Sequence, residues 1–421
     1  MAILFVLLAL AVLAVVVTAN WYVWRRLFRD TTRGPGWVRR GGAALIAGGW
    51  AMAVGALVAE RTGAPFPLQQ ALAWPGFLWL ALSVYLLLGV LAGEAVRPLL
   101  RRHLERRDRT SERAAPAPTP AVVTAPPLAA AEDPAPPAPP APPASPAPSR
   151  RLFVSRVVGG AAAAAAVGTV GYGTYGVLRG PRVKRVTVPL AKLPRAAHGY
   201  RIAVVSDIHL GPVLGRDFAR KVVDTINGTQ PDLIAVVGDL VDGSVKDLGP
   251  AAAPLAGLKA RHGSFFVTGN HEYFSGAEQW VEEVRRLGLL PLENARTELP
   301  WFDLAGVNDV AGESEGHGPD FVKALGDRDT ARACVLLAHQ PVQIHDAVEH
   351  GVDLQLSGHT HGGQLWPGSL IAAAANPTVA GLERYGDTQL YVSRGAGAWG
   401  PPTRVGAPSD ITLIQLTSPD A

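Results

Sequence analysis

Four long apolar stretches dominate the first part of the chain. They cover residues 2–19, 41–59, 72–93 and 152–178, and the first three contain no charged residue. A helix needs about 20 apolar residues to cross the hydrocarbon core of a bilayer. The pattern therefore predicts three membrane-spanning helices within residues 1–100. A weaker fourth apolar segment, rich in Gly and Ala, is predicted at 151–180.

The pattern changes after residue 180, where short apolar runs alternate with amphipathic segments. Runs rich in Val, Ile, Leu and Phe predict buried strands at 200–206, 233–237, 264–267, 302–307, 335–338 and 354–356. Apolar residues at helical spacing predict helices at 216–228, 248–259 and 277–287. Because the strands alternate with helices, residues 181–421 are predicted to form an α/β domain.

A segment of biased composition joins these two regions. Residues 114–148 hold 14 Pro and 13 Ala, so we expect a basic and then Pro/Ala-rich, disordered linker over 101–150. Arg150 and Arg151 then precede the fourth apolar segment, as in a twin-arginine export signal. Two arginines that only anchor a fourth membrane helix are the alternative, and both interpretations send the C-terminal domain outside.

Charge divides the chain at the same place. The net charge is +4, but residues 1–180 hold 18 Arg, no Lys and 8 acidic residues, whereas residues 181–421 carry a net −6. Arginine clusters at 25–40 and 97–113 predict cytoplasmic segments of a multi-pass plasma-membrane protein. The C-terminal domain is then predicted on the extracytoplasmic side. Its negative charge makes a nucleic-acid partner unexpected.

The sequence contains one cysteine, Cys334. A single cysteine excludes an intramolecular disulfide and a thiolate metal cluster. Because Cys334 lies in an apolar run, it is predicted to be a buried strand residue.

Polar side chains follow the predicted strands, at the point where each strand ends. They are Asp207, His209, Asp239, Asn270, His271, His339, His359 and His361. In open α/β sheets this edge is where ligands bind. Carboxylate, amide oxygen and imidazole form a mixed oxygen and nitrogen donor set that suits Mn, Fe or Zn. The sequence therefore predicts a metal site at this edge.

The ordered set Asp-x-His, Gly-Asp, Gly-Asn-His, a lone His and Gly-His-x-His resembles the calcineurin-like metallophosphoesterase family over roughly residues 198–417. The resemblance implies a four-layer α/β/β/α sandwich and two divalent metal ions. By resemblance, Asp207, His209 and His361 bind one metal, Asn270, His339 and His359 bind the other, and Asp239 bridges them. The resemblance also implies that His271 faces the substrate as the acid or as the group that stabilises the leaving group.

Segments 269–273, 358–364 and 392–404 are similar to bacterial membrane-associated or exported members, including enzymes like UDP-2,3-diacylglucosamine hydrolases. This similarity implies hydrolysis of a phosphodiester or phosphomonoester by a metal-activated hydroxide. A lipid-linked or cell-envelope precursor is a candidate substrate. Asn308, Asp309 and Arg404 are further candidates for contact with the substrate.

Two other functions remain open at this point. A receptor or transport-like membrane protein could bind a phosphorylated ligand at the metal domain without turnover, although the presence of His271 and every ligand position argues against it. A nuclease or a protein phosphatase could use the same scaffold, and the negative charge of the domain disfavours the nuclease.

Overall fold

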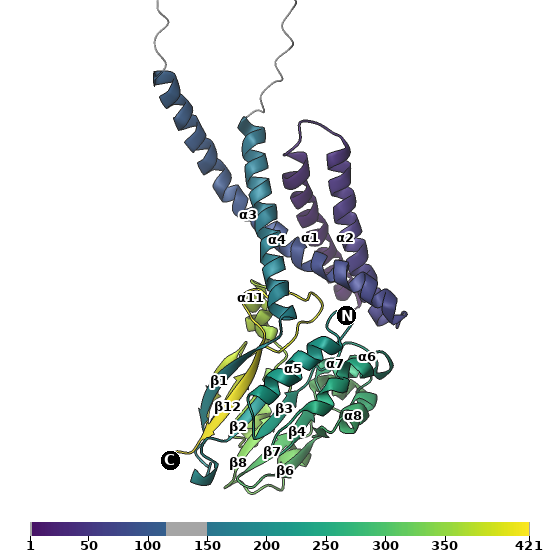
Figure 1. Cartoon of the computed structure of the whole chain (residues 1–421), viewed down its shortest axis with the longest axis vertical. Coiled ribbons are helices and arrows are strands. Elements are labelled where there is room, and N and C mark those ends of the chain that lie inside the picture. The colour runs from purple at the N-terminus through teal and green to yellow at the C-terminus, as the bar shows by residue number, and fades with distance from the viewer. Residues whose placement is uncertain (1, 115–149, 421) are drawn as a thin grey trace, which may run out of the picture. The chain divides into compact units, whose positions relative to one another are not determined.

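The computed structural model describes residues 2–114 and 150–420 (Figure 1). The apolar stretches form four long helices: α1 (Ala2–Trp24), α2 (Trp37–Arg61), α3 (Phe66–Ala114) and α4 (Arg150–Leu178). Each of the four is long and apolar enough to cross a membrane. A short π-helical turn, η1 (Arg25–Arg29), continues α1.

The basic end of α3 differs from the sequence-based expectation. The predicted linker starts at residue 101, but α3 continues to Ala114. Residues 101–114 are rich in Arg and Glu, which are good helix formers, so a high density of charge alone does not end the helix. The Pro/Ala-rich part of the predicted linker, residues 115–149, lies outside the described residues.

The chain divides into two compact units, whose boundaries run through α2, α3 and α4. The units are Met1–Ile46 with Leu86–Ala165, and Ala47–Tyr85 with Ala166–Ala421. Within the first unit, Arg26 forms ion pairs with Asp30 at 2.9 Å and with Glu94 at 2.8 Å. The second unit combines the strand-containing domain with residues 47–85, which we call the α2–α3 hairpin, and with the end of α4.

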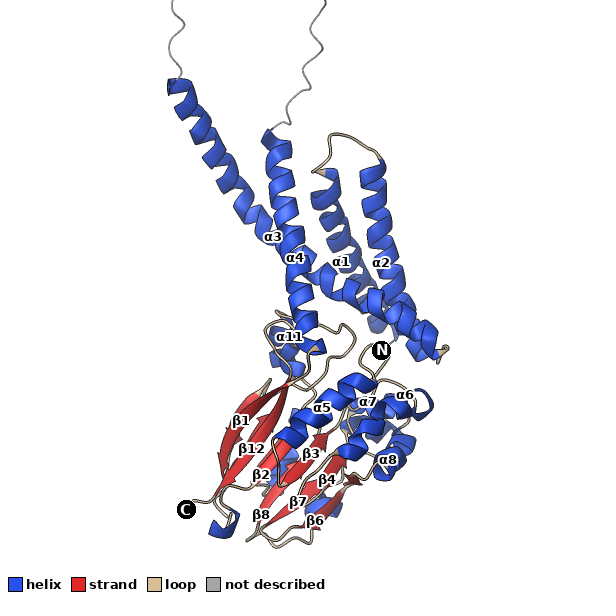
Figure 2. Cartoon of the chain, viewed as in Figure 1, coloured by secondary structure: helices blue, strands red, loops and turns tan. Residues whose placement is uncertain are grey.

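Two six-stranded sheets form the centre of the C-terminal domain (Figure 2). The first has the order β1 (Arg182–Pro189), β12 (Asp410–Thr417), β2 (Arg201–Val205), β3 (Leu233–Val237), β4 (Ser264–Val267) and β5 (Leu290–Pro291). The second has the order β10 (Gly381–Tyr385), β11 (Thr388–Val392), β9 (Leu354–Ser357), β8 (Ala333–Leu337), β7 (Phe302–Gly306) and β6 (Ala295–Glu298). Strands β2, β3 and β4 are parallel, as are β7, β8 and β9. The carboxyl ends of three central strands therefore meet at one edge of each sheet.

Alternate side chains of the central strands enter different cores. In β2, Ile202 and Val204 face a core that both sheets share, whereas Ala203 and Val205 pack against helices. This alternation follows from the period of two along a strand, and burial on both faces explains why these strands read as unbroken apolar runs. Cys334 is fully buried in β8, as predicted. The domain is therefore a four-layer α/β/β/α sandwich, which confirms the expected fold class.

Helices cover the outer faces of the two sheets. On the first sheet, α5 (Arg216–Gly228), α6 (Val245–Ala252) and α8 (Ala277–Arg286) pack through Phe218, Leu248 and Trp280, and Figure 1 shows these helices in front of the strands. On the second sheet, α9 (Phe321–Leu325) and α10 (Ile344–Glu349) pack through Phe321 and Ile344. Two further helices, α7 (Asn270–Ser275) and α11 (Gly368–Ala375), follow β4 and β9.

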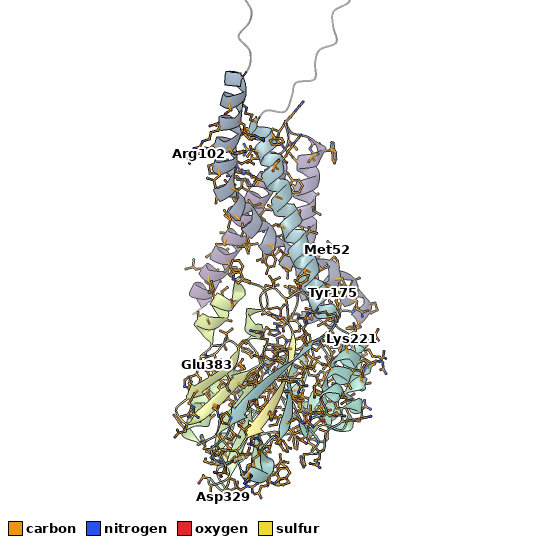
Figure 3. The ribbon with its side chains drawn as sticks, turned by 60° about the vertical axis from the view of Figure 1, so that its left-hand side comes forward. Met52, Arg102, Tyr175, Lys221, Asp329 and Glu383 are labelled. Carbon is orange, nitrogen blue, oxygen red and sulfur yellow. The ribbon has the colours of Figure 1, made fainter. Side chains whose placement is uncertain are left out.

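The end of α4 is packed into the sandwich. Only three residues separate α4 from β1, which pairs in parallel with β12. Val177 is fully buried in the core beneath α5, and Lys221, labelled in Figure 3, donates a 2.6 Å hydrogen bond to the carbonyl oxygen of Leu178. The hydroxyl of Thr174 lies 2.7 Å from that of Thr403. The junction between α4 and the sandwich is therefore a fixed one.

Candidate metal centre

The residues that the sequence marks as metal ligands lie on loops that leave the carboxyl ends of five strands. Asp207 and His209 follow β2, Asp239 follows β3, Asn270 and His271 follow β4, His339 follows β8, and His359 and His361 follow β9. The parallel order of these strands brings the loops to one edge of each sheet, and the structure groups their side chains into two clusters.

Several of these residues have a left-handed backbone. Asp207, His209, Asp239, His359 and His361 all have φ between 48° and 70°. A residue other than Gly in this region costs on the order of 1–3 kcal/mol and persists only where the surroundings enforce it. Such positions concentrate at functional sites. The repeated strain therefore marks this edge as a site where side-chain direction is controlled by the fold.

The first cluster contains Asp207, His209 and His361. The Nε2 atoms of His209 and His361 lie 3.1 Å apart, and Nε2 of His361 lies 3.3 Å from Oδ1 of Asp207. The carboxylate of Asp207 also accepts the backbone N–H of His359 at 3.0 Å and the hydroxyl of Ser206. One carboxylate and two imidazoles thus point at a common position, which fits a divalent cation.

The second cluster contains His339 and His359, with Asn270 and the carboxylate of Asp239 beside them. Nε2 of His339 lies 3.1 Å from Oδ2 of Asp239, and Nδ1 of His359 lies 3.0 Å from the amide oxygen Oδ1 of Asn270. Burial and the neighbouring His339 lower the pKa of His359 to about 4, so this ring is neutral at pH 7. A neutral imidazole has the lone pair that a metal ligand needs.

Asp239 lies between the two clusters. Its Oδ2 is 3.1 Å from His339 and 3.7 Å from Nε2 of His209, while its Oδ1 accepts the backbone N–H of His271 at 2.9 Å. Burial favours the neutral acid, but the charges of His339 and His209 outweigh burial and hold the pKa of Asp239 well below its usual value. Asp239 is therefore an ionised carboxylate within reach of both clusters.

The hydrogen bonding of the two ring nitrogens of His339 shows whether this cluster fits a metal ion. Its Nδ1 lies 2.9 Å from the carbonyl oxygen of Val237, and a carbonyl only accepts hydrogen bonds, so Nδ1 carries the proton. The second ring nitrogen, Nε2, is buried without a hydrogen bond that meets geometric criteria, and it lies 3.1 Å from Oδ2 of Asp239. Burial disfavours the charge of His339, but Asp239 outweighs burial and raises the pKa of the ring well above its usual value, so a metal ion at Nε2 would replace a proton there. One nitrogen fixed by a backbone carbonyl and the other directed at the site is the usual arrangement of a metal-ligating histidine. The cluster therefore fits a metal ion.

Two glycines allow the loops to approach this closely. A Cβ atom on Gly238, whose φ is 72°, would lie 2.6 Å from Nδ1 of His339 and 2.7 Å from the Cα atom of Gly269. No side chain fits at that distance, so the exits of β3 and β4 require glycine where they pass each other.

A cavity of about 520 Å³ opens at the two clusters. It is lined by Leu57, Glu60, Arg61, Asp239, Asp242, Gly243, Asn270, His271, Phe274, Ser275, His359, His361 and Trp399. The ring of His271 lies edge-on to Phe274 and Trp399, with centroids 5.5 and 5.6 Å away. The cavity therefore brings together His271 and four of the seven candidate ligands, Asp239, Asn270, His359 and His361, beside Phe274 and Trp399. We call it the polar cavity after these titratable and amide side chains.

Comparison with known proteins agrees with this geometry. The family model described as "Calcineurin-like phosphoesterase" matches residues 200–363. An uncharacterized metallophosphoesterase of Aquifex aeolicus is 35% identical over 240 residues, which cover 56% of this chain and 91% of that protein. The chain belongs to the calcineurin-like phosphoesterase family. Every metal ligand that the sequence predicts lies within the matched residues, and membership indicates a hydrolase of phosphoric esters.

Two further relatives of this calcineurin-like phosphoesterase are matched over only part of their length. A "Transmembrane protein with metallophosphoesterase domain" of Danio rerio is 40% identical over 260 residues, which cover 58% of this chain and 59% of the relative. An uncharacterized metallophosphoesterase of Helicobacter pylori is 40% identical over 247 residues, which cover 58% of this chain and 66% of the relative. The chain thus spans about three fifths to two thirds of these relatives. Neither name gives a substrate.

Asp242 joins His209 to His271 in the phosphoesterase site, and the sequence analysis missed it. Its Oδ1 lies 2.9 Å from Nδ1 of His209 and 2.7 Å from Nδ1 of His271. Burial disfavours the charge of Asp242, but the two histidines outweigh burial and lower its pKa to about 2. Burial likewise lowers the pKa of His271, but Asp242 outweighs it and raises the value to about 9. Asp242 therefore orients His209 and keeps His271 protonated.

Glu272 is a second buried acid that the sequence analysis gave no role. Its carboxylate accepts the backbone N–H groups of Asp239 at 2.9 Å, Leu240 at 2.7 Å and Gly269 at 2.6 Å. These bonds tie the loop after β3 to the loop after β4. The signal for both missed acids is their position, since Asp242 and Glu272 each lie within three residues of a predicted ligand at a strand end.

The three candidates for substrate contact lie away from the cavity lining described above. Arg404 is buried and donates to the carbonyl oxygens of Gly397 at 2.6 Å and His361 at 3.0 Å, so it positions the loop that carries His361. Asn308 donates to a backbone carbonyl at 3.0 Å, and Asp309 accepts the side chain of Gln340 at 2.9 Å. The side chains of all three therefore make structural hydrogen bonds, and their contact with substrate stays a prediction.

Proposed function

We propose that the protein is a membrane-anchored phosphoesterase that uses two divalent metal ions to hydrolyse a phosphodiester or phosphomonoester. The observation that carries the proposal is the position of Asp239, an ionised carboxylate within 3.7 Å of one cluster and 3.1 Å of the other. A carboxylate shared by two donor sets can hold two ions close together, as in two-metal hydrolysis.

The donor sets define which residues would hold each ion. Asp207, His209 and His361 would hold one, Asn270, His339 and His359 would hold the other, and Asp239 would contribute to both. Two ions of Mn, Fe or Zn bound there would supply an activated water as nucleophile and neutralise charge on the phosphate. Asp207 and Asp239 provide negative charge for two cations, and the neutral ring of His359 provides a nitrogen donor without adding charge.

His271 would act as the general acid. It lines the cavity, and Asp242 holds its Nδ1 at 2.7 Å and keeps the ring protonated. The proton on Nε2 is then the one available to the substrate, and its transfer to the leaving oxygen releases the alcohol. Asp242 restores the proton affinity of the ring after each transfer, so it is a positioning residue for this step.

The helices support a membrane location for the reaction. Four helices are long and apolar enough to span a bilayer, and the α2–α3 hairpin belongs to the same compact unit as the sandwich. We therefore propose an amphiphilic phosphate ester, such as a lipid or cell-envelope precursor, as substrate. We also propose that the hairpin turn at 62–65 and the phosphoesterase domain share the extracytoplasmic side.

Hydrolysis by the full-length protein tests the proposal. The protein, reconstituted in lipid nanodiscs with Mn²⁺, is assayed on bis(4-nitrophenyl) phosphate and on 4-nitrophenyl phosphate. We expect turnover of at least one ester, its loss on chelation, and its recovery when the metal is restored. Asp239→Ala is the variant that must stay inactive after metal addition. Bound metal without turnover of either ester would favour a ligand-binding protein instead.

Topology has a separate test. Phosphatase and fluorescent-protein fusions after residue 421 report the side of the membrane on which the domain lies. If the twin-arginine machinery exports the domain, the paired substitution Arg150→Lys with Arg151→Lys should abolish its appearance outside the cytoplasm. Normal export of that variant would show that the two arginines only anchor α4.

A further inference from the structure

The α2–α3 hairpin packs directly against the phosphoesterase domain within one compact unit. Phe77 is only 4% exposed and forms an apolar cluster with Ala56 and Ala73, against which Val213 of the domain packs. Phe66, at the start of α3, packs against the core beneath the first sheet. The hairpin is therefore a fixed part of the domain surface that surrounds the metal centre.

A second cavity lies beside the polar one and has a different character. Its volume is about 170 Å³, and its wall is formed by Leu57, Phe77 and Leu80 from the hairpin and by residues 211–214 of the loop after β2. His209 and Asp242 reach it from the metal centre, and the remainder of the lining is mainly apolar. We call this space the apolar slot.

The apolar slot and the polar cavity share part of their walls. Leu57, Glu60, Asp242 and Trp399 line both. The two spaces are therefore neighbours across one boundary, and two of its four residues, Leu57 and Glu60, come from α2. A molecule with a polar end at the metal ligands can extend an apolar end directly past Leu57 and Trp399.

The hairpin also brings a cation to the polar cavity. Arg61, at the end of α2, is the single Lys or Arg among the described residues that line this cavity. Its guanidinium lies 5.5 Å from the centroid of the Phe274 ring, a position typical of a cation–π contact. Because Asp242 adds negative charge at the same boundary, the positive charge of Arg61 favours an anionic substrate here, in addition to the protonated His271.

We propose that the α2–α3 hairpin determines substrate specificity: Arg61 binds the anionic phosphate end, and the apolar slot lined by Leu57, Phe77 and Leu80 receives an alkyl or acyl chain of the same substrate. The inference rests on the proposed phosphoesterase function and assigns its substrate to the class of phosphate esters that carry an apolar chain. It places the determinants of that choice outside the sandwich, in residues that the family match does not cover.

A chain-length series tests the slot. Full-length protein in nanodiscs with Mn²⁺ is assayed on methyl, butyl and hexyl 4-nitrophenyl phosphate diesters. Burial of one methylene is worth about 0.8 kcal/mol, which corresponds to about a fourfold gain in kcat/KM per buried CH₂ until the slot is full. We expect kcat/KM to rise along the series. Equal values for methyl and hexyl esters would overturn the proposal.

Variants assign this effect to the hairpin. Leu80 lines the slot but not the polar cavity, so Leu80→Trp should reduce the hexyl-to-methyl ratio of kcat/KM by about tenfold, in line with the cost of misfit in an apolar pocket. Leu80→Ala should shift the preference to longer chains. The matched control is Leu68→Trp, an exposed position on the same helix outside both cavities. A parallel loss on all esters with Leu80→Trp would overturn the proposal.

Substitution of Arg61 should change kcat/KM in a different pattern from substitution of Leu80. Arg61→Gln should lower kcat/KM for every chain length by about tenfold, the scale of one charge-assisted hydrogen bond, and Arg61→Lys should recover part of it. Calorimetry with hexyl phosphate and methyl phosphate gives the same chain-length comparison without turnover. If neither a diester nor a monoester is hydrolysed, the phosphoesterase function fails, while tighter binding of hexyl phosphate that Leu80→Trp removes would still support the slot.

Discussion

The two sheets of the sandwich contribute different chemistry to the same centre. The first sheet supplies all three carboxylates, Asp207, Asp239 and Asp242, together with His209, Asn270 and His271, whereas the second supplies only His339, His359 and His361. Charge that balances two cations therefore comes from one side. The other side adds nitrogen donors that hold a metal without adding negative charge. We therefore expect substitutions on the first sheet to change the charge available to the cations, and substitutions on the second sheet to remove nitrogen donors.

The loops of the two sheets are also held by different means. Glu272 ties the loops after β3 and β4 through three backbone N–H groups. On the second sheet, Arg404 binds the backbone of His361, and the hydroxyl of Ser357 donates to the carbonyl of Ala338 at 2.6 Å. A buried acid thus organises the first set of loops, and a buried cation helps to organise the second.

The largest expected effect on activity comes from loss of Asp239, the carboxylate between the two donor sets. Asp239→Ala should reduce kcat/KM by about 10³-fold or more, beyond the loss from removal of one preorganised donor, and should lower the content of both ions. His339→Ala should lose one ion and retain the other, because Asp207, His209 and His361 remain. Metal content by mass spectrometry and kcat/KM on one diester measure both. Equal metal loss in the two variants would contradict the shared role of Asp239.

The next effect concerns the acid of the first sheet. His271→Ala should lower kcat by about 10²–10⁴-fold, because it removes the proton donor for the leaving group, but it should leave bound metal unchanged. His345→Ala, an exposed position on α10, is the matched control. Steady-state kinetics with metal analysis separates the two readouts. A variant with undiminished kcat would show that His271 does not act as the acid.

A smaller effect is expected from Asp242, whose carboxylate contacts the candidate ligand His209. Asp242→Asn should weaken metal binding by about 10–100-fold, because Asp242 orients His209. Asp217→Asn, an exposed acid on α5, serves as the control for loss of one charge. Titration of chelator-treated protein with Mn²⁺ measures both affinities. Identical affinities in the two variants would exclude a positioning role for Asp242.

The smallest effect is a shift in proton affinity. In chelator-treated protein, His271 should titrate near pH 9, above its ordinary pKa of 6.5. The stability it contributes is therefore fully present below about pH 6.5 and lost as the pH rises through about 9. The contribution of Asp242 has the opposite sign: it is present above about pH 3.8 and lost as the pH falls through about 2.

Imidazole NMR measures this shift, with the His271 signal assigned by its absence in His271→Gln. In Asp242→Asn, burial is opposed only by the charges of Asp239 and Glu272, so the pKa of His271 should fall well below 9. A His271 signal that still titrates near pH 9 in this variant would show that another group raises it.

The sequence predicted the elements and the grouping of polar side chains at the strand ends better than it predicted contacts between distant segments. Apolar runs with polar residues at their ends located β2, β3, β4, β8 and β9, because buried parallel strands have a simple pattern. The donors that the resemblance marked also lie together in the structure. Asp242 and Glu272 were missed, since their roles depend on the turn geometry after each strand and not on spacing alone.

The contribution of the α2–α3 hairpin could not be predicted from the pattern. In the sequence, Leu57 and Arg61 look like the ordinary end of an apolar helix. Their spacing gives no sign that they contact the C-terminal domain. Their place beside the polar cavity arises from tertiary packing of Phe77 and Phe66. The helical extension of α3 to Ala114 was missed for a different reason. The basic segment 101–114 is as polar as a linker, and it lies next to the Pro/Ala-rich segment, but its residues have a high helix propensity.

The fixed junction between α4 and β1 has a consequence for how such an enzyme meets its substrate. Three residues and a buried Val177 leave the sandwich no slack to diffuse away from the end of the helix. For the membrane anchoring and the amphiphilic substrate proposed above, the search would be confined to a plane, and turnover would follow the number of substrate molecules per unit area. Dilution of such a substrate with inert lipid should then slow the reaction, while a change in bulk volume should make no difference.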